Sequence, residues 1–471
     1  MSLNRYVSFA FKSFIFFSAI LLVGCFDFDI DQAKKSEAVE QAFRYDNQVT
    51  VPDRKKIKTL LSNGDYKDAE TILHSVQEEY EHGGNEYAVF KAYEIFTVND
   101  EVLLEYLNKW VAHSPGAYVA NAARGIYLVS QGWRHRGSKF INKTSTKQID
   151  GMRESNYKAA IDLDKALKLN PRFLPAYQKL LEVGMNSFGH EFLDKVFNAA
   201  MQQNPNSFYI YSKYIYANEP KWGGSYQKLE SIADEAQKHL DQNPRLYNLR
   251  AQKYIALGNS KSSDKEYKEA IEYYSKALKY GPGLYCLYRR AKAYGRINET
   301  IKQFADLNLL LDIDPYYVNG LEARAGAYQK QRKFDEARID FEKIISIEPD
   351  NKWSTNSLGW IYQNMREYQK AAIMLEQTLK YHPKNKYALI QLGWTYNRLT
   401  QYEKAIPILE KRLELTPDDA KAWLYYADAQ IDTNNPDGKQ SLQRYLELVD
   451  HNNKDEKATI EKAKEYLKTH Q

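Results

Sequence analysis

Five prolines recur at a nearly constant interval in the C-terminal half of the chain. Pro282, Pro315, Pro349, Pro383 and Pro417 follow one another at a spacing of about 34 residues. A fixed period of this length indicates stacked supersecondary units that pack on their neighbours, rather than one globular core. Because proline cannot continue a helix, each one is expected to follow the end of a helix and to begin the next turn. The period therefore predicts an array of helical units.

Other positions keep the same period. An alanine stands twelve residues before four of the prolines, and a bulky apolar residue follows each alanine by four residues. These pairs are Ala270 and Tyr274, Ala337 and Phe341, Ala371 and Leu375, and Ala405 and Leu409. Small residues such as Gly359 let two helices approach closely, while the bulky residues fill the space between neighbours. The pattern predicts helical hairpins.

This pattern resembles that of the tetratricopeptide repeat (TPR) family. The resemblance implies an all-α solenoid of helical hairpins, wound as a right-handed superhelix, over residues 244–450. The unit that ends at Pro315 departs from the pattern, because Gln303 stands where the alanine is expected. The charged segment over residues 451–471 is expected to form the capping helix that closes the array.

Residues 54–243 are predicted to form a divergent, helical, repeat-like domain. Pro171 and Pro205 are separated by the same period, so the repeat spacing extends upstream of the clear units. The segments around Trp133 and Trp222 resemble a bacterial family of domains of unknown function that is often fused to TPRs. That resemblance implies a helical domain and carries no known activity.

Two interpretations of these tryptophan segments remain open. Trp133, Arg136, Lys221 and Trp222 could line a pocket for an anion or a peptide. Alternatively, the two tryptophans fill a junction between helices and the neighbouring glycines make a tight turn. The second interpretation is favoured, because loops connecting helices commonly need such packing.

Residues 1–24 have the pattern of a signal peptide. Arg5 and Lys12 precede a short apolar run, which ends in Leu22-Val23-Gly24-Cys25. That ending resembles the lipobox of bacterial lipoproteins, which implies cleavage before Cys25 and a lipid attached to its thiol. An uncleaved membrane anchor is the alternative. Residues 25–53 are polar and are expected to form a tether.

The lipobox resemblance implies a location in the bacterial cell envelope, lipid-anchored and facing the periplasm. Phe26 rather than aspartate follows the cysteine, which favours the outer membrane over the inner membrane. The second cysteine, Cys286, falls between Tyr285 and Leu287 on an expected helix. It is therefore predicted to be a buried, inert thiol.

Composition and motifs argue against several functional classes. The 66 lysines and arginines nearly balance the 61 aspartates and glutamates, so nucleic acid is not expected as a partner. The nine histidines show no metal-ligand spacing, and the sequence contains no P-loop, G-x-S-x-G or dinucleotide-binding glycine motif. We therefore expect no catalytic residue, no metal and no cofactor, and we do not expect an enzyme.

The TPR resemblance also implies where a partner would bind. In that family the first helices of the hairpins form a concave face that holds a peptide or a helix. By alignment, the residues facing inward are Tyr285, Tyr288, Lys292, Asn319, Glu322, Trp353, Asn356, Trp360, Tyr387, Trp394, Asn397 and Arg398. Aromatic rings offer contact area at low entropic cost, and side-chain amides pair with an extended backbone. The alternative is that about half of these rings pack on the next repeat.

Two functions are kept from different classes. The first is a lipid-anchored periplasmic adaptor that binds a protein or peptide partner in an envelope complex. The second is an envelope hydrolase or carbohydrate-binding lipoprotein, whose N-terminal domain carries the chemistry while the repeats dock it. A cluster of His135, His190 and acidic side chains would favour the second function.

Overall fold

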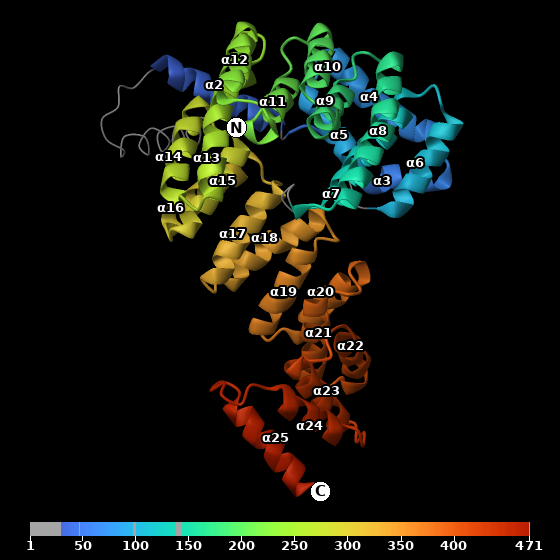
Figure 1. Cartoon of the computed structure of the whole chain (residues 1–471), viewed down its shortest axis with the longest axis vertical. Coiled ribbons are helices and arrows are strands. Elements are labelled where there is room, and N and C mark those ends of the chain that lie inside the picture. Colours follow the sequence, from blue (N-terminus) through green and yellow to red (C-terminus); the bar gives the residue numbers. More distant parts are fainter. Residues whose placement is uncertain (1–29, 47, 98–99, 138–142, 471) are drawn as a thin grey trace, which may run out of the picture. The chain divides into compact units, whose positions relative to one another are not determined.

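The chain folds into helices throughout the part that is described. The computed structural model describes residues 30–46, 48–97, 100–137 and 143–470. Within these ranges the chain forms α-helices joined by short 3-10 and π turns, with no strand (Figure 1). The predicted all-α class is therefore confirmed. The signal peptide and Cys25 lie outside the described residues.

Two compact units make up the fold. Unit 1 holds the described residues up to Asp264 together with Glu272–Gly283. Unit 2 holds Lys265–Ile271 and the chain from Leu284 onward. Residues 244–264 and 272–283, which belong to the expected repeat array over residues 244–450, thus pack with the N-terminal unit.

Unit 1 is an assembly of α-helices of very different lengths. Its α-helices are α2 (Ile30–Asp46), α3 (Arg54–Asn63), α4 (Tyr66–Glu81), α5 (Glu86–Tyr93), α6 (Glu101–His113), α7 (Tyr118–Arg136), α8 (Thr146–Leu169), α9 (Leu174–Val183), α10 (His190–Gln203), α11 (Phe208–Ala217), α12 (Tyr226–Ala236) and α13 (Gln252–Ser263). The short turns are η1 (Glu94–Phe96), η3 (Gly184–Phe188), η4 (Pro220–Trp222), η5 (Gln237–His239), η6 (Pro244–Ala251) and η7 (Leu278–Tyr280). A buried apolar cluster that includes Trp110 and Tyr93 runs through these helices.

Helix α2 corrects the expected tether over residues 25–53. It packs on η6 and η7, and Val39 on its inner side is fully buried. Asp46, at its last position, forms an ion pair with Arg245, and the Gln32 amide donates to the Lys279 carbonyl at 3.2 Å. Residues 30–46 are therefore part of folded unit 1, because burial of Val39 and the ion pair between Asp46 and Arg245 hold the helix in place.

Helices α7 and α8 pair through the same type of contact as a TPR hairpin. A side chain added at Gly125 would meet Leu163, 2.8 Å from the added carbon. In unit 2 the equivalent pair is Gly359 and Leu375, also at 2.8 Å. The two partners are much farther apart in sequence in α7–α8 than in the repeat. Unit 1 thus contains a repeat-like hairpin with a longer stretch of chain between the two contact residues.

Unit 2 is a series of two-helix hairpins followed by one last helix. After α14 (Tyr267–Ala277), which spans both units, come α15 (Leu284–Arg296), α16 (Thr300–Ile313), α17 (Val318–Lys330), α18 (Phe334–Ile347), α19 (Lys352–Asn364), α20 (Tyr368–Tyr381), α21 (Lys386–Arg398), α22 (Tyr402–Leu415), α23 (Ala420–Asp432), α24 (Gly438–Leu448) and α25 (Lys457–Thr469). The closest pairs are α15–α16, α17–α18, α19–α20, α21–α22 and α23–α24, and each hairpin then packs on the next (Figure 1). Helix α25 packs on α24 through Ile460 and Ala463.

The turns inside the hairpins share one backbone conformation. Arg332, Arg366, Thr400 and Asn434 have φ between 55° and 61°, and each lies one repeat after the one before it. The amide after each of them bonds back to the last turn of the first helix, as Gln401 N does to Tyr396 O at 2.9 Å. Glycine usually occupies such left-handed positions, so these turns are strained.

Two adjacent hairpins carry a buried ion pair between their helices. Arg290 pairs with Asp306 at 2.7 Å, and Arg324 pairs with Asp340 at 2.8 Å. A similar pair joins α7 to α8 in unit 1, where Arg124 lies 2.7 Å from Asp162. One repeat after Arg324 and Asp340 the sequence has Leu358 and Met374 instead. The same position therefore accepts either a charged pair or an apolar pair.

Candidate functional site

The first candidate is the exposed side of the first helices in unit 2. We call it the first-helix face and define it by the twelve predicted residues on α15, α17, α19 and α21. Tyr285, Asn319, Trp353 and Tyr387 are each the second residue of their helix, and all four are exposed. The exposed fractions of the three aromatic residues are 44%, 43% and 42%. An aromatic or amide side chain thus recurs at one exposed position of four successive repeats.

Two tryptophans lie two turns further along helices α19 and α21, and their surroundings differ from those of the exposed residues. Trp360 and Trp394 are half-buried and occupy equivalent positions of successive repeats. Trp360 packs edge-on against Phe334, with ring centroids 5.6 Å apart, and Trp394 packs the same way against Tyr368 at 5.8 Å. Each ring therefore contacts the first residue of the preceding second helix. These contacts fit the alternative in which such rings pack between repeats.

The polar members of the first-helix face are partly engaged by the protein itself. The Asn397 amide donates to the Tyr425 carbonyl at 2.7 Å, and Glu322 accepts from Asn351 at 3.1 Å. Lys292 Nζ lies 3.2 Å from the Tyr288 hydroxyl. The remaining members are Asn356, which is half-buried, and Arg398, whose guanidinium lies over the Trp394 ring.

The tryptophan segments of unit 1 come together, as the sequence pattern predicts. The rings of Trp133 and Trp222 lie 6.2 Å apart, edge to face, and Trp133 Nε1 donates to Glu182 at 2.5 Å. Burial raises the pKa of Glu182, but Lys179, Lys213 and the Trp133 bond outweigh it and lower the pKa to about 2. Trp133 and Glu182 satisfy one another, which supports a helix junction, whereas Trp222 Nε1 is buried without a hydrogen-bond partner among the described residues.

Arg136 and Lys221, the charged members of these segments, also contact rings of the same junction. The Arg136 guanidinium lies 5.5 Å from the Trp133 ring, and Lys221 Nζ lies 4.3 Å from the Tyr216 ring. Lys221 forms an ion pair with Glu219 at 2.8 Å as well. Both cations therefore already have partners within unit 1.

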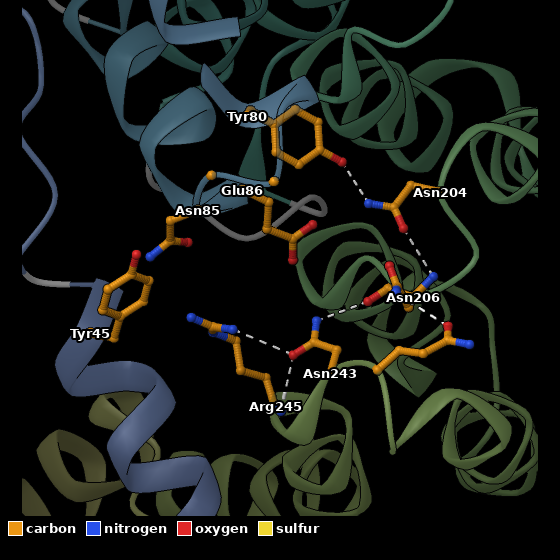
Figure 2. A pocket seen from close by; sticks show the side chains of 11 residues that line it. Tyr45, Tyr80, Asn85, Glu86, Asn204, Asn206, Asn243 and Arg245 are labelled. Carbon is orange, nitrogen blue, oxygen red and sulfur yellow. Dashed lines mark hydrogen bonds between the residues drawn. The ribbon is translucent and has the colours of Figure 1, made fainter. Parts of the chain in front are cut away.

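A polar cavity in unit 1 is the second candidate, and no sequence motif predicted it. Its volume is about 220 Å³. It lies where the end of α2, the α4–α5 connection, the α10–α11 connection and the start of η6 meet. The lining residues are Tyr45, Tyr80, Gly83, Gly84, Asn85, Glu86, Asn204, Asn206, Gln242, Asn243 and Arg245, as Figure 2 shows. Five of the eleven lining residues have an amide side chain.

The amides tie the walls of this cavity together. Asn204 Nδ2 donates to the Tyr80 hydroxyl at 2.6 Å, and Asn243 Nδ2 donates to the Asn206 carbonyl at 2.8 Å. Asn206 Nδ2 donates to Gln242 Oε1 at 3.3 Å (Figure 2). Each of these bonds joins segments that are distant in sequence, so the shape of the cavity is fixed by the fold.

Two buried carboxylates and one guanidinium lie at the cavity. Asp46 binds Arg245 through both oxygens and also accepts bonds from the Tyr209 hydroxyl at 2.7 Å and the Asn85 amide at 2.8 Å. Glu86 is 8% exposed, and its Oε1 accepts a hydrogen bond from the Phe208 amide at 3.0 Å. Its Oε2 is buried and has no hydrogen-bond partner among the described residues.

Burial dominates the titration of Glu86. It raises the pKa of this carboxyl to about 7, although the Ser207 hydroxyl, Arg245 and the Phe208 amide act in the opposite direction. The cavity thus combines hydrogen-bonding walls with a carboxyl group that has an unused acceptor. Such an arrangement can hold a polar or cationic group.

Three other expectations concern the thiol, metal ions and the membrane. Cys286 is buried, as predicted, and burial raises the pKa of its thiol to about 12. Within the described ranges, no three His, Cys, Asp or Glu side chains are grouped so that they could hold a metal ion. None of the helices in the same ranges has both the length and the apolar character needed to cross a bilayer.

Comparison with known families identifies two kinds of domain. Residues 53–198 match a domain of unknown function, DUF4034. Tetratricopeptide repeats match residues 244–282 and 321–351 in one family model and residues 356–420 in another.

Individual relatives match smaller parts of the chain. The human protein sperm-associated antigen 1 is 30% identical over 86 residues, which cover 18% of this chain and 9% of that protein. The chain therefore spans less than a tenth of the length of this curated relative.

Among solved structures, YrrB, described as a TPR protein with an unusual peptide-binding site, is 16% identical. It covers 37% of this chain and 91% of its own, with a TM-score of 0.35. The MamA protein is 21% identical over 36% of this chain and 94% of its own, with a TM-score of 0.33.

Proposed function

The chain joins a DUF4034 domain to tetratricopeptide repeats, and on this premise we propose that it is a lipid-anchored adaptor of the bacterial cell envelope. Repeats of this family suggest a scaffold that binds a protein or a peptide. In the proposal, the first-helix face of unit 2 holds the partner, and the adaptor acts without catalysing a reaction.

One observation carries the binding part of the proposal. Tyr285, Trp353 and Tyr387 keep about two-fifths of their surface exposed at the same position of their repeats. Exposed aromatic side chains in register are favoured at contact surfaces, because they bury a large area without losing much side-chain entropy. Trp360 and Trp394 border this row and stiffen it through their contacts with Phe334 and Tyr368.

The anchoring part rests on the sequence Leu22-Val23-Gly24-Cys25. Helix α2 begins at Ile30, five residues after Cys25, and it is docked on unit 1. Five residues reach at most about 18 Å when fully extended. An adaptor with a lipid on Cys25 would therefore hold unit 1 close to the membrane surface rather than on a long tether. A periplasmic side and the outer membrane belong to the same proposal.

Site-specific photocrosslinking in the producing cell tests the binding surface. A photoreactive phenylalanine analogue replaces Tyr387, Trp353 or Ile373 in three separate full-length variants. Ile373 is also exposed but lies on a second helix, α20, so it serves as the matched control. We expect a discrete adduct from position 387, with the same partner captured from position 353, and none from position 373.

Equal adducts from positions 387 and 373 would contradict the proposed surface. The proposed surface would also be contradicted if the double substitution Tyr285→Ala with Tyr387→Ala left the adduct from position 353 unchanged. Both substitutions of this double variant change only exposed side chains, so unfolding would not explain a loss of the adduct.

A further inference from the structure

The cavity of unit 1 has one negative charge more than it can neutralise. Asp46 and Glu86 are both buried beside it, while Arg245 is the one cation among its lining residues. Arg245 is already used, because it binds both oxygens of Asp46 and also donates to the Ala42 carbonyl at 3.0 Å. An ionised Glu86 therefore lacks a counter-charge among the described residues that line the cavity.

The carboxylate of Glu86 is also incompletely hydrogen-bonded. Its Oε1 is used by the Phe208 amide, whereas Oε2 is buried and has no partner among the described residues; the Glu86 side chain as a whole lines the cavity (Figure 2). A buried carboxylate oxygen without a donor costs free energy, and a bound cation would remove that cost. Tyr80, Asn204 and Gln242 line the same cavity, and their side-chain oxygens, which each accept one hydrogen bond already, keep a second lone pair as a further acceptor.

The number of available oxygens decides which cation fits. A guanidinium prefers both oxygens of a carboxylate, because its N–H groups form a rigid fork. An ammonium is a compact charge with three rotatable donors and needs one carboxylate oxygen plus neutral acceptors. Glu86 offers one oxygen and the walls offer neutral acceptors, so the ammonium is the better match.

We propose that this cavity binds the primary ammonium group of an alkylamine, with the Glu86 carboxylate as acceptor and counter-charge. The shared chemistry is an ammonium on a short aliphatic chain, and it could come from a free small amine or from a lysine side chain of a protein. The site is independent of the first-helix face, since all of its lining residues belong to unit 1.

Ligand-observed NMR on the full-length chain at pH 8 tests this site with three probes. They are N-acetyl-lysine amide, N-acetyl-norleucine amide, which has the same chain without the ammonium, and n-butylamine. We expect the lysine derivative to bind at least tenfold more tightly than the norleucine derivative. Binding of n-butylamine as tight as that of the lysine derivative would identify a free amine as the source. Weaker binding of n-butylamine would identify a protein lysine.

Glu86→Gln removes the charge and keeps the shape, and we expect it to weaken binding of the lysine derivative at least tenfold. The matched control is Glu219→Gln, which also neutralises a buried glutamate of unit 1 but lies outside the cavity. It should leave the affinity unchanged. Equal binding of the two acetylated probes, or unchanged affinity in folded Glu86→Gln, would overturn the proposal.

An exposed lining residue gives a second test that does not depend on the buried site tolerating a change. Gln242 is exposed at the mouth of the cavity. Gln242→Glu should tighten binding of N-acetyl-lysine amide several-fold and Gln242→Lys should weaken it. If the two variants bind equally, no cation enters this cavity.

Binding should also depend on pH, because Glu86 must lose its proton to serve as counter-charge. The charged and titratable groups facing Glu86 are Asp46 on α2, Tyr80 on α4, Tyr209 on α11 and Arg245 on η6. With the Glu86 pKa near 7, the affinity should fall about tenfold from pH 8 to pH 6. A flat pH profile would count against Glu86 as the binding group.

Discussion

Both oxygens of Asp340 accept hydrogen bonds from Arg324, from Nε at 2.9 Å and from Nη2 at 2.8 Å, across the two helices of one repeat. Asp340 is almost fully buried, and the following repeat has Leu358 and Met374 in the equivalent positions. A buried ion pair often contributes no more to stability than a well-packed apolar pair, whereas a single buried charge is strongly unfavourable.

We therefore predict opposite outcomes for the single and the double substitution at this pair. Arg324→Leu leaves Asp340 without its partner and should lower the free energy of unfolding by about 3–5 kcal/mol. Arg324→Leu with Asp340→Met copies the next repeat and should recover most of that loss. Urea denaturation of the parent, the single variant and the double variant measures the three free energies of unfolding. A double variant as unstable as the single one would contradict the prediction.

The left-handed turn at Thr400 should be improved by glycine. A β-branched residue at φ 55° costs about 1–2 kcal/mol, while glycine adds about 0.5–1 kcal/mol of unfolded-state entropy. Thr400→Gly should thus raise the free energy of unfolding by about 0.5–1 kcal/mol, as measured by its urea midpoint. Asn434→Gly, with the same φ at a residue that tolerates this region, should give a smaller gain.

Unit 1 should lose stability as pH rises through the titration range of Glu86. The carboxyl has a pKa of about 7 in the fold and 4.5 as its ordinary value, so the folded state holds the proton more tightly. Its contribution is greatest below pH 4.5 and decreases up to pH 7, by on the order of 3 kcal/mol.

Thermal unfolding of the parent and of Glu86→Gln at pH 5 and at pH 8 isolates this effect. The parent should lose more stability than the variant between the two pH values, since glutamine does not titrate. Parallel pH dependences of the two proteins would show that Glu86 is not the responsible group.

The rings of the first-helix face should separate into two groups by their effect on folding. Trp394→Ala removes a half-buried ring that packs on Tyr368, so we expect a loss of about 2 kcal/mol in the free energy of unfolding. Tyr387→Ala removes an exposed ring of the same helix and should cost less than about 1 kcal/mol. Circular dichroism melts distinguish the two, and equal losses would mean that Tyr387 belongs to the packing between repeats.

Lipid attachment is predicted to depend on the thiol of Cys25. Cys25→Ala should abolish incorporation of a labelled fatty acid and leave an uncleaved precursor of higher mass on a gel. Cys286→Ala, at the buried second cysteine, is the control and should leave labelling intact. Continued labelling of the Cys25→Ala protein would exclude this anchor.

The sequence predicts the hairpins of unit 2 because their contacts are local. Gly359 and Leu375 meet within one repeat, and the prolines mark each helix end, so the repeat period alone carries the necessary information. Helix α2 could not be predicted in this way. Its charged partner, Arg245, is 199 residues away, and no local pattern indicates that a polar segment will be clamped there.

The polar cavity of unit 1 could not be predicted from the sequence for a related reason. Asn85, Asn204 and Asn243 each accept a bond from a backbone amide two residues later, which is the ordinary role of asparagine at a helix start or turn. In sequence they cannot be distinguished from other caps. Only the fold brings their remaining amide groups around Glu86.

The docking of α2 also sets an order of assembly. The Gln32 amide bonds to the Lys279 carbonyl, 247 residues later, so the helix has no complete binding surface until the chain has been made to that point. A 17-residue helix is only marginally stable alone in water. Since chains are synthesised from the N-terminus, α2 is made before the surface on which it docks. Chains that stop before Arg245 would lack η6 and η7, and the apolar side of α2 with Val39 would stay exposed.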